Sequence, residues 1–331
     1  MKKVKILITG ATGFIGSHLV DRFLTNNNDI KVIVRKSSNL RWIENLPVEL
    51  SYASFYDISA LEEVVKDVDY VYHVAGLTAA KNYDEFLKAN RDATKNLLQA
   101  CLNVNSNLKK FVLISSQTVA GPSRSFDLPV TENDTPHPIT SYGKSKKEGE
   151  DVAISFMSQL PITIVRPPAV YGPRDTAIKD IFKTAKAGLG VLIGFSKKYV
   201  SLIHSTDLVR GIELAGTSEK STGQIYFITS SRFYTWNEIM DLMKKVMNKK
   251  MFVTLKLPHF LILSIAWISG FLGKFSAKPP VFDYEKGIDF IQDYWTSSPM
   301  KAKEELGFVS EISIEDGIKE TFQWYIDNKW I

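Results

Sequence analysis

The 331-residue chain contains one cysteine, Cys101, so it can form neither an intrachain disulfide nor a cysteine-based zinc site. We predict no metal centre, and because cysteine scarcity fits a reducing compartment, we expect a cytoplasmic protein. The net charge is +5, yet no basic tract exceeds a Lys-Lys pair with its neighbours. The charge pattern therefore does not predict a nucleic-acid partner.

Long apolar runs are also scarce. Residues 257–273 form the one apolar stretch that suggests a membrane, but it is shorter than the ~20 residues of a spanning helix and contains proline, histidine, serine and glycine. We expect a buried or pocket-lining helix there, with contact to a membrane surface as the less favoured alternative. Lysines precede the first apolar run, but glycines interrupt that run, so we expect no targeting segment.

A glycine-spaced turn lies near the start of the chain. An apolar run over residues 4–8 ends at Thr9 and is followed by Gly10, Gly13 and Gly16, after which apolar residues recur at helical spacing. Gly10 permits the backbone angles of the turn, Gly13 a close approach to phosphate, and Gly16 close packing of helix on strand. The free N–H groups of the helix attract an anion. This context predicts a dinucleotide site.

Strand and helix patterns alternate beyond this turn. Predicted strands cover residues 30–35, 48–53, 70–74, 111–116 and 162–167, and predicted helices cover 58–65, 83–103 and 141–159. This alternation predicts an α/β fold with a Rossmann-type, doubly wound parallel sheet. We expect an NAD(P)-binding domain over residues 1–170, with 199–230 returning to the sheet. Residues 171–198 and 231–331 are expected to form a smaller, mostly helical C-terminal substrate lobe over the sheet's carboxyl edge.

Two polar groups indicate chemistry. Tyr142 and Lys146 are four residues apart at the start of a predicted helix, so both lie on one face. A neighbouring ammonium would lower the phenol's pKa and make proton exchange with an alcohol or carbonyl practical. Ser115 and Ser116 end a predicted strand, where a hydroxyl can bind a substrate oxygen. Alone, each pattern also fits a solvated helix face or a strand-end cap.

The glycine turn, the serine pair and the Tyr-Lys pair together resemble the extended short-chain dehydrogenase/reductase superfamily, of the NAD-dependent epimerase/dehydratase type. The resemblance runs from Lys3 to about Asp207. It implies hydride transfer between a nicotinamide and a substrate carbon that bears oxygen. Ser116, Tyr142 and Lys146 would be catalytic: the tyrosine exchanges the proton, the serine orients the oxygen, and the lysine holds the nicotinamide ribose and tunes the tyrosine.

Other segments match the same family. Asn90 corresponds to its central-helix asparagine, Glu150 extends the Tyr-x-x-x-Lys motif, and residues 166–175 and 202–208 match two landmarks, in the second of which Asp207 would be structural. The resemblance also implies a homodimer through the helices that carry Asn90 and Tyr142. The cofactor-binding residues that we predict are Gly10, Thr12, Gly13, Phe14, Ile15, Gly16, Arg35, Lys36, Ser54, Phe55, Ala75, Asn90, Tyr142, Lys146 and Pro167.

The end of the second strand bears on the choice of cofactor. NAD-preferring folds carry an acidic residue there for the ribose 2′-OH, whereas arginine supports a 2′-phosphate. This chain has Arg35 and Lys36, so we predict NADP(H), with NAD(H) possible if Arg35 instead stacks on the adenine. The family's Gly-Asp after the third strand is replaced by Ala53-Ser54, and Ser54 or the Phe55 backbone would substitute at the adenine.

The later part of the chain bears on the substrate. Nucleotide-sugar epimerases and dehydratases of this family hold a diphosphate with arginines, but here Val200, preceded by Lys197 and Lys198, and Lys286 stand near those positions. The apolar stretch 257–273 and the Pro-Pro-Val-Phe-Asp-Tyr segment 279–284 look more like the dihydroflavonol reductase and 3β-hydroxysteroid dehydrogenase branches. We therefore favour an apolar alcohol or ketone substrate, with a nucleotide sugar as the alternative and a non-catalytic cofactor-binding protein as a minor one.

Overall fold

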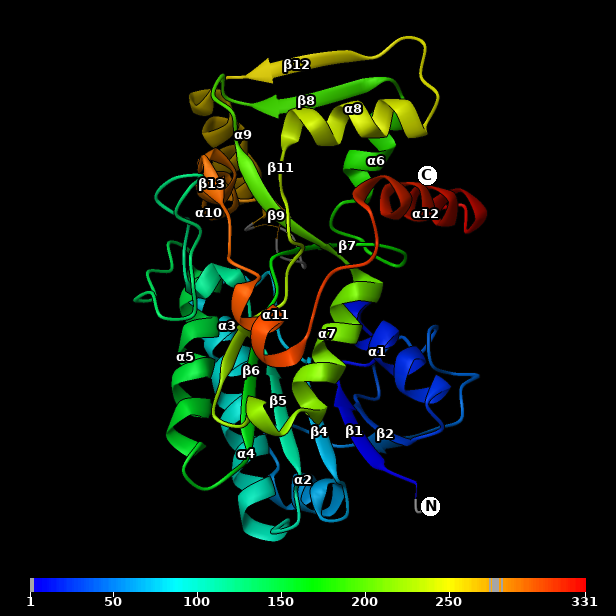
Figure 1. The fold of residues 1–331 in the computed structure, drawn as a ribbon, viewed down its shortest axis with the longest axis vertical. Helices are drawn as coiled ribbons and strands as arrows, with labels where there is room; N and C mark the ends of the chain where they lie inside the picture. The colour runs from blue at the N-terminus through cyan, green and yellow to red at the C-terminus, as the bar shows by residue number, and fades with distance from the viewer. Residues whose placement is uncertain (1–2, 274, 276–279, 281) are drawn as a thin grey trace.

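The computed structural model describes residues 3–273, 275, 280 and 282–331. A parallel seven-stranded sheet in the order β10-β6-β5-β4-β1-β2-β3 forms the lower part of the molecule in Figure 1. Its strands are β1 (Lys5–Thr9), β2 (Asp29–Val34), β3 (Val48–Tyr52), β4 (Tyr70–His73), β5 (Lys110–Ile114), β6 (Ile162–Arg166) and β10 (Ile225–Phe227). The strand order reverses between β1 and β4, where ligands of such sheets bind. The predicted doubly wound fold is confirmed.

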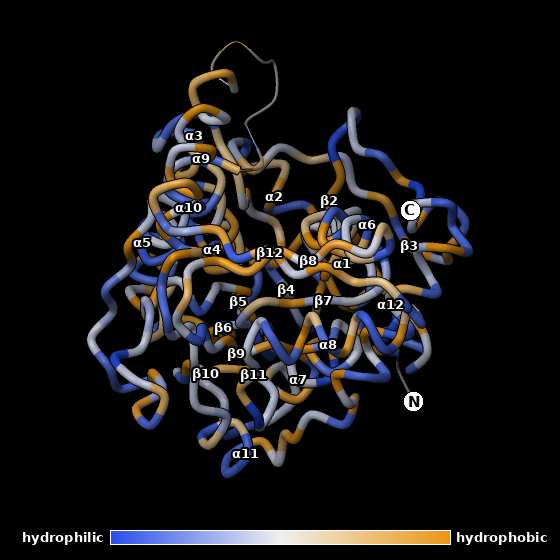
Figure 2. Tube along the Cα trace, turned by 90° about the horizontal axis from the view of Figure 1, so that it is seen from above, coloured by the Kyte–Doolittle hydropathy of each residue, from blue (hydrophilic) through white to orange (hydrophobic). Residues whose placement is uncertain are grey.

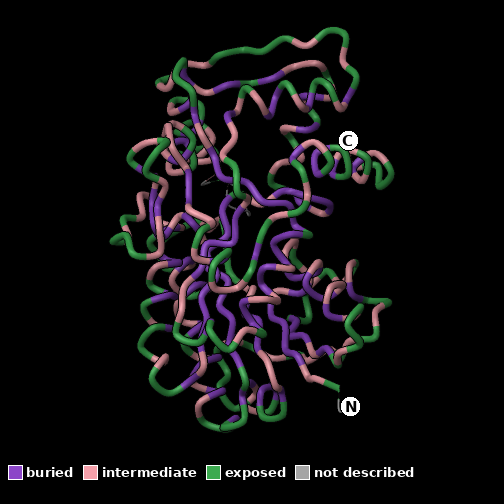
Figure 3. Tube along the Cα trace, in the orientation of Figure 1, coloured by how far each residue is buried: buried purple, intermediate pink, exposed green. Residues whose placement is uncertain are grey.

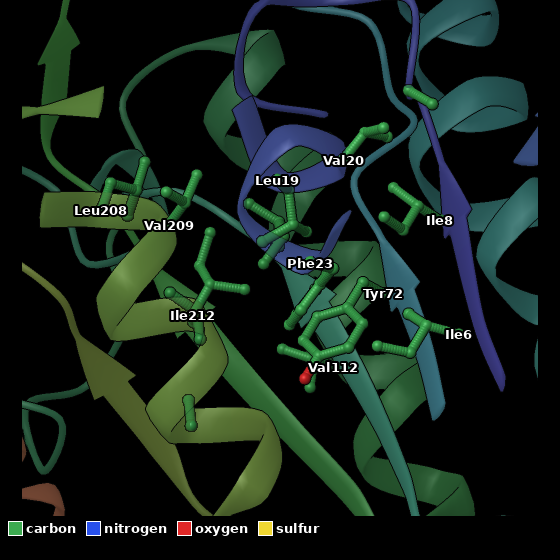
Figure 4. Packing of buried hydrophobic residues seen from close by; sticks show 14 of the residues in the cluster. Ile6, Ile8, Leu19, Val20, Phe23, Tyr72, Val112, Leu208, Val209 and Ile212 are labelled. Atoms are coloured by element: carbon green, nitrogen blue, oxygen red, sulfur yellow. The ribbon is translucent and has the colours of Figure 1, made fainter. Parts of the chain in front are cut away.

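Helices cover both faces of this sheet. One face carries α1 (Phe14–Thr25) and α7 (Ser205–Thr217), and the other carries α2 (Ile58–Val65), α4 (Ala93–Val104) and α5 (Ser141–Phe156). Neighbouring residues of a strand point to opposite faces, so Ile6 and Ile8 of β1 pack toward α1 and α7, as Figure 4 shows, while Leu7 packs on the other side. Cys101 is a core residue of that second side, as expected. Figure 3 shows the sheet as the most buried part of the molecule.

A second lobe lies over the carboxyl ends of the strands (Figure 1). It contains a sheet of β7 (Ala169–Tyr171), β9 (Tyr199–His204), β11 (Phe233–Thr235) and β13 (Tyr294–Trp295), and a pair of β8 (Leu189–Ile193) with β12 (Val253–Leu257). Its helices are α6 (Lys179–Lys186), α8 (Trp236–Val246), α9 (His259–Gly273), α10 (Tyr284–Ile291) and α12 (Ile314–Asp327), whereas α11 (Met300–Leu306) packs against β10 and the core of the main sheet. Sequence reasoning had not predicted β7, β8, β11, β12 or β13.

The prediction that residues 199–204 return to the main sheet is wrong. Only the later run does so, as β10, whose Ile225 pairs with Ile164 of β6. β9 instead pairs with β7, β11 and β13 in the second lobe. Both runs are largely buried, and an apolar run indicates burial without indicating which sheet receives the strand.

Residues at the N-cap positions begin three of the later helices. Thr235 and Glu238 form a capping box at the start of α8, and Ser313 caps α12. Pro299 is the N-cap of α11.

Helix α9 is not buried as expected. Only Ile262 and Ala266 among its residues are buried, and much of its remaining apolar surface faces outward. Within the described ranges, no helix has the length and apolar character to cross a bilayer. Of the segment 279–284, Pro279 and Val281 lie outside the described residues.

Candidate active site

The glycine turn after β1 forms a compact cradle. Gly10 has a φ of +70°, and a Cβ there would lie 2.7 Å from the amide nitrogen of Ala75. A Cβ on Gly16 would lie 2.1 Å from the Gly10 carbonyl oxygen, so helix α1 lies against the turn only because this residue is glycine. Helix α1 starts after Gly13, and no side chain in the described part of the chain caps its first turn. The first-turn amides, including that of Ile15, thus fit a dinucleotide diphosphate.

A buried polar chain supports this cradle from below, and sequence reasoning missed it. Thr94 Oγ1 donates to the Asn90 carbonyl, at 2.9 Å, so it must accept the 3.0 Å bond from His73 Nε2–H. His73 Nδ1 then accepts from Thr9 Oγ1, at 2.8 Å, and Thr9 Oγ1 accepts from the Ala75 amide, at 3.1 Å. Burial lowers the pKa of His73 to about 3, so the ring stays neutral. This chain of hydrogen bonds fixes β1, β4 and α4 to one another.

Asn90 joins the loop after β4 to the helix that carries Tyr142. Its Oδ1 accepts from the Leu77 amide at 2.9 Å, and its Nδ2 donates to the Leu77 carbonyl at 3.1 Å and to Ser145 Oγ at 2.9 Å. The predicted helix 83–103 is interrupted here, since α3 (Tyr83–Leu87) passes through a π-helical turn (Lys88–Asp92) into α4. A Cβ on Gly149 would lie 2.3 Å from the Asn90 carbonyl oxygen, so α5 passes directly against this turn.

Ser116 and Tyr142 are brought together by close packing of two turns. Thr118 donates to Ser116 Oγ from its amide, at 3.2 Å, and from its hydroxyl, at 2.9 Å. Ser116 also lies close enough to the Tyr142 phenol to lower its pKa against the effect of burial. A Cβ on Gly143 would lie 2.7 Å from the Thr118 carbonyl oxygen, so the first turn of α5 packs directly on the turn after β5. Ser115 Oγ is buried and unpartnered among the described residues.

Lys146 lies on the same helix face but does not act on Tyr142 as predicted. Its Nζ donates to the Ile114 carbonyl at 2.7 Å, and burial lowers its pKa to about 8 against the opposing charge of Glu150. The pKa of the Tyr142 phenol is raised rather than lowered: burial raises it most, the nearby Ser116 opposes this, and the charge of Asp289 raises it further. Lys146 is not among the groups that shift the pKa of this phenol, and burial is the largest cause of the shift.

Glu150 has a partner that the motif did not reveal. Arg166, at the end of β6, donates from Nε to one carboxylate oxygen at 2.9 Å and from one terminal nitrogen to the other at 2.6 Å. Both side chains are 2% exposed. This bidentate pair joins α5 to the sheet one turn beyond Lys146.

Asp289 is a site residue that sequence reasoning missed. It is 6% exposed, its Oδ1 is unpartnered among the described residues, and its Oδ2 lies 3.7 Å from Lys286 Nζ. Burial raises its pKa to about 6. Glu285, one turn earlier on α10, accepts from the amide and the hydroxyl of Ser141, each at 2.7 Å. A carboxyl group is thereby held within electrostatic reach of Tyr142. The four-residue spacing between Glu285 and Asp289 was the one feature of the sequence that could have indicated this arrangement.

Arg35 and Lys36 lie exposed at the end of β2, where the adenosine end of a dinucleotide binds in such sheets. The Ser38 amide donates to the Arg35 carbonyl at 2.9 Å, and the Arg35 amide donates to Ser38 Oγ at 3.0 Å, so a tight turn presents both side chains. Burial raises the pKa of Tyr56, and the charge of Arg35 opposes this. Arg35 and the loop after β3 therefore face one another.

The expected adenine contacts have partners of their own. Ser54 Oγ accepts from the Tyr56 amide at 3.2 Å, and the Phe55 carbonyl accepts from Asn96 Nδ2 at 2.9 Å. The Ser54 hydroxyl hydrogen and a second lone pair on the carbonyl remain for a ligand. Of the other predicted cofactor residues, Thr12 and Phe14 lie in the cradle and are half-buried, while Pro167 is buried and accepts from the Gln117 amide at 2.8 Å.

Asp207 has the structural role expected of it. Its carboxylate accepts from the amides of Glu311 and Ile312, at 2.8 to 3.0 Å, and from Arg210. These bonds hold the segment before α12 against α7.

Residues 6–229 match the model of the NAD dependent epimerase/dehydratase family. The chain is 29% identical to "Ceramide reductase" of Caulobacter vibrioides, covering 98% of this chain and 96% of that protein. It is 27% identical to "Sterol-4-alpha-carboxylate 3-dehydrogenase, decarboxylating" of Dictyostelium discoideum, over 95% of this chain and 99% of that protein. Sugar-nucleotide enzymes are also similar: "UDP-glucose 4-epimerase" of Vibrio cholerae is 26% identical over 97% and 95%.

Solved structures share the fold at low identity. A UDP-glucose 4-epimerase with UDP-glucose from Thermotoga maritima superposes with a TM-score of 0.79, at 23% identity over 98% of this chain and 100% of that one. A UDP-glucuronic acid 4-epimerase from Bacillus cereus, solved with UDP-glucuronic acid and NAD, has a TM-score of 0.77 at 23% identity over 98% and 100%. The architecture is thus common to proteins that bind a nicotinamide cofactor.

Proposed function

The chain belongs to the NAD-dependent epimerase/dehydratase family, and from that premise we propose that it is an NAD(P)-dependent oxidoreductase acting on a secondary alcohol or ketone of a largely apolar molecule. The observation that carries this proposal is the convergence of Ser116, Tyr142 and Lys146 beside the glycine cradle. The non-catalytic alternative is disfavoured because all three groups that the reaction needs are present.

In this proposal a bound nicotinamide supplies or accepts the hydride at the substrate carbon. During reduction, Tyr142 Oη gives its proton to the substrate oxygen, and Ser116 orients that oxygen through its hydroxyl while Thr118 holds Ser116. Lys146 Nζ would hold the nicotinamide ribose. Gly10, Gly13 and the first turn of α1 would hold the diphosphate. Oxidation reverses each step, with Tyr142 receiving the proton.

The interactions of two lysines in the second lobe support an apolar substrate. Lys198 is 4% exposed and donates to the carbonyls of Ile291 and Gln292 and to Asp293, so it is not free for a diphosphate. Lys286 is paired with the buried Asp289, whose negative charge would repel a phosphate. Two similar proteins are named for reactions of lipids, a ceramide and a sterol.

The substrate class is tested by screening NADPH- and NADP-linked turnover with hydrophobic alcohols and ketones beside nucleotide sugars. We expect net oxidation or reduction of the nicotinamide with members of the hydrophobic panel. Epimerisation of a nucleotide sugar without net change of the cofactor would refute the proposal in favour of the epimerase alternative.

We predict a preference for NADP(H) that depends on Arg35. A charge-assisted contact to the 2′-phosphate contributes about 1.5–3 kcal/mol, so Arg35→Ser should weaken NADPH binding by about ten- to 100-fold and leave NADH binding nearly unchanged. Competitive titration of both reduced cofactors measures this. Arg124→Ser, at another exposed arginine, is the control. Equal or tighter binding of NADH to the unaltered protein contradicts the prediction.

We predict that Asp289 sets the pH range of the reaction through Tyr142. Its negative charge raises the pKa of the phenol, so Asp289→Asn should lower that pKa and shift the alkaline rise of alcohol oxidation to lower pH. The profile of kcat/KM against pH measures the shift, and Asp241→Asn, the same change at an exposed position of α8, should leave it in place. An unchanged profile in Asp289→Asn would remove this residue from the site.

A further inference from the structure

Helix α9 presents large apolar side chains to the outside of the molecule. Trp267 is 61% exposed and stacks on Phe271 at a ring-centroid distance of 5.9 Å, with Phe271 in turn against Phe275 at 5.6 Å. Figure 2 shows α9 as a hydrophobic helix at the edge of the molecule beside α10. We call the exposed apolar residues of this segment the α9 face: Phe260, Leu261, Ile265, Trp267, Ile268, Phe271, Leu272 and Phe275.

The chain segment that contains the α9 face carries charge of one sign, although Asp283, the N-cap of the neighbouring α10, lies against Gly270. Between Asp241 and Asp283 the sequence contains no aspartate or glutamate. The same interval contains seven lysines, Lys244, Lys245, Lys249, Lys250, Lys256, Lys274 and Lys278. A strongly apolar face within a segment whose charged residues are all lysines matches a surface that has an apolar interior beneath an anionic outer layer.

The strand that leads into α9 also exposes apolar side chains. In β12, Val253 is 55% exposed and Leu255 is 45% exposed, and Met251 just before it is 83% exposed. Leu257 ends the strand, and α9 starts two residues later (Figure 1). Residues 251–275 thus expose apolar side chains from a strand and a helix in succession.

We propose that the α9 face docks on the surface of a lipid bilayer that contains anionic headgroups, with α9 lying in the interface rather than crossing it. The inference rests on the proposed function, because it supplies a path for an apolar substrate. Helix α9 packs on α10, and Glu285 of α10 bonds to Ser141, the residue before Tyr142. A substrate dissolved in the bilayer would therefore be collected close to the catalytic tyrosine.

A second copy of the chain is a poorer partner for the same surface. Two copies joined through their α9 faces would bring two basic, acid-free segments together, and like charges repel at such an interface. An anionic bilayer neutralises those lysines instead. The homodimer that the family resemblance implies would use the helices that carry Asn90 and Tyr142, and not the α9 face.

The test is flotation of the full-length protein with vesicles of phosphatidylcholine alone or with added phosphatidylglycerol. We expect binding to the anionic vesicles that weakens at high salt, and at least a tenfold lower bound fraction for Trp267→Ser/Phe271→Ser. The matched control, Leu128→Ser/Val309→Ser, removes two apolar side chains of 64% and 45% exposure and should bind like the unaltered protein.

Two measurements keep this test independent of the proposed function. Circular dichroism and NADPH binding of the Trp267→Ser/Phe271→Ser variant should match the unaltered protein, and neither requires a known substrate. Equal flotation of both double variants would overturn the proposal. So would sedimentation velocity that shows Trp267→Ser/Phe271→Ser disrupting a dimer while vesicle binding persists, because the α9 face would then be a self-interface.

Discussion

Tyr142→Phe is expected to lower kcat by about 10²–10⁴-fold, the usual contribution of a positioned general acid or base. Phenylalanine keeps the ring and its contact with Phe86, whose centroid lies 6.1 Å away, but it lacks the hydroxyl whose proton the proposed reaction transfers. The NADPH dissociation constant should change only a few-fold, since the glycine cradle, Lys146 and Arg35 are untouched. Steady-state kinetics and fluorescence titration measure the two effects separately.

Tyr284→Phe is the matched control for this result. It removes a hydroxyl at the start of α10, where the side chain is 48% exposed, and should leave kcat unchanged. Turnover that survives undiminished in Tyr142→Phe would show that the proton moves by another route. An unaltered protein that binds nicotinamide but turns over neither the hydrophobic panel nor the nucleotide sugars would instead support the non-catalytic alternative.

The features predicted from sequence are those in which neighbours along the chain decide the geometry. The strand, turn and helix around Gly10 and Gly16 follow from one short segment, since Gly10 supplies the positive φ of the turn and Gly16 permits contact with the Gly10 carbonyl. Tyr142 and Lys146 share a face because four residues make about one helical turn. The match of Ser116 rather than Ser115 depended on the family resemblance and stays a prediction.

The features that were missed depend on residues far apart in the chain. His73 was predicted only as part of an apolar strand over residues 70–74, and the fold alone places it between Thr9 and Thr94. Asp289 reaches the site because Glu285 of α10 bonds to the start of α5, a contact that no local pattern contains. Long-range packing, rather than propensity, decided both positions.

The error over α9 has a different origin. The apolar composition of α9 predicts that its side chains are shielded from water. Burial in the protein core was the simpler way to achieve this, and we predicted it. The helix is apolar on all sides, so its sequence does not distinguish the face that packs on α10 from the face that looks outward. A helix of this kind is expected to find a second apolar surface, and the bilayer proposal names one.

Glu150→Gln is expected to destabilise the protein by about 3–5 kcal/mol, the range observed when one member of a buried ion pair is removed. The substitution keeps the size of the side chain but leaves the Arg166 guanidinium charged and 2% exposed. One of its terminal nitrogens already has no hydrogen-bond partner among the described residues. The free energy of unfolding from urea titration measures the loss, and Glu148→Gln, an exposed position two residues earlier, should change it little.

Removing both charges separates the cost of an unpaired arginine from a direct role of the pair. If the loss in Glu150→Gln reflects an uncompensated buried charge, then Glu150→Gln/Arg166→Met should recover much of it, because two neutral side chains need no mutual compensation. The double variant also tests a link to catalysis, because Glu150 raises the pKa of Lys146 against the effect of burial. Loss of Glu150 should therefore lower the pKa of Lys146 further. Cofactor binding should then weaken above neutral pH. A double variant as unstable as Glu150→Gln would mean that the pair contributes through its fixed geometry between α5 and β6, and not through charge balance.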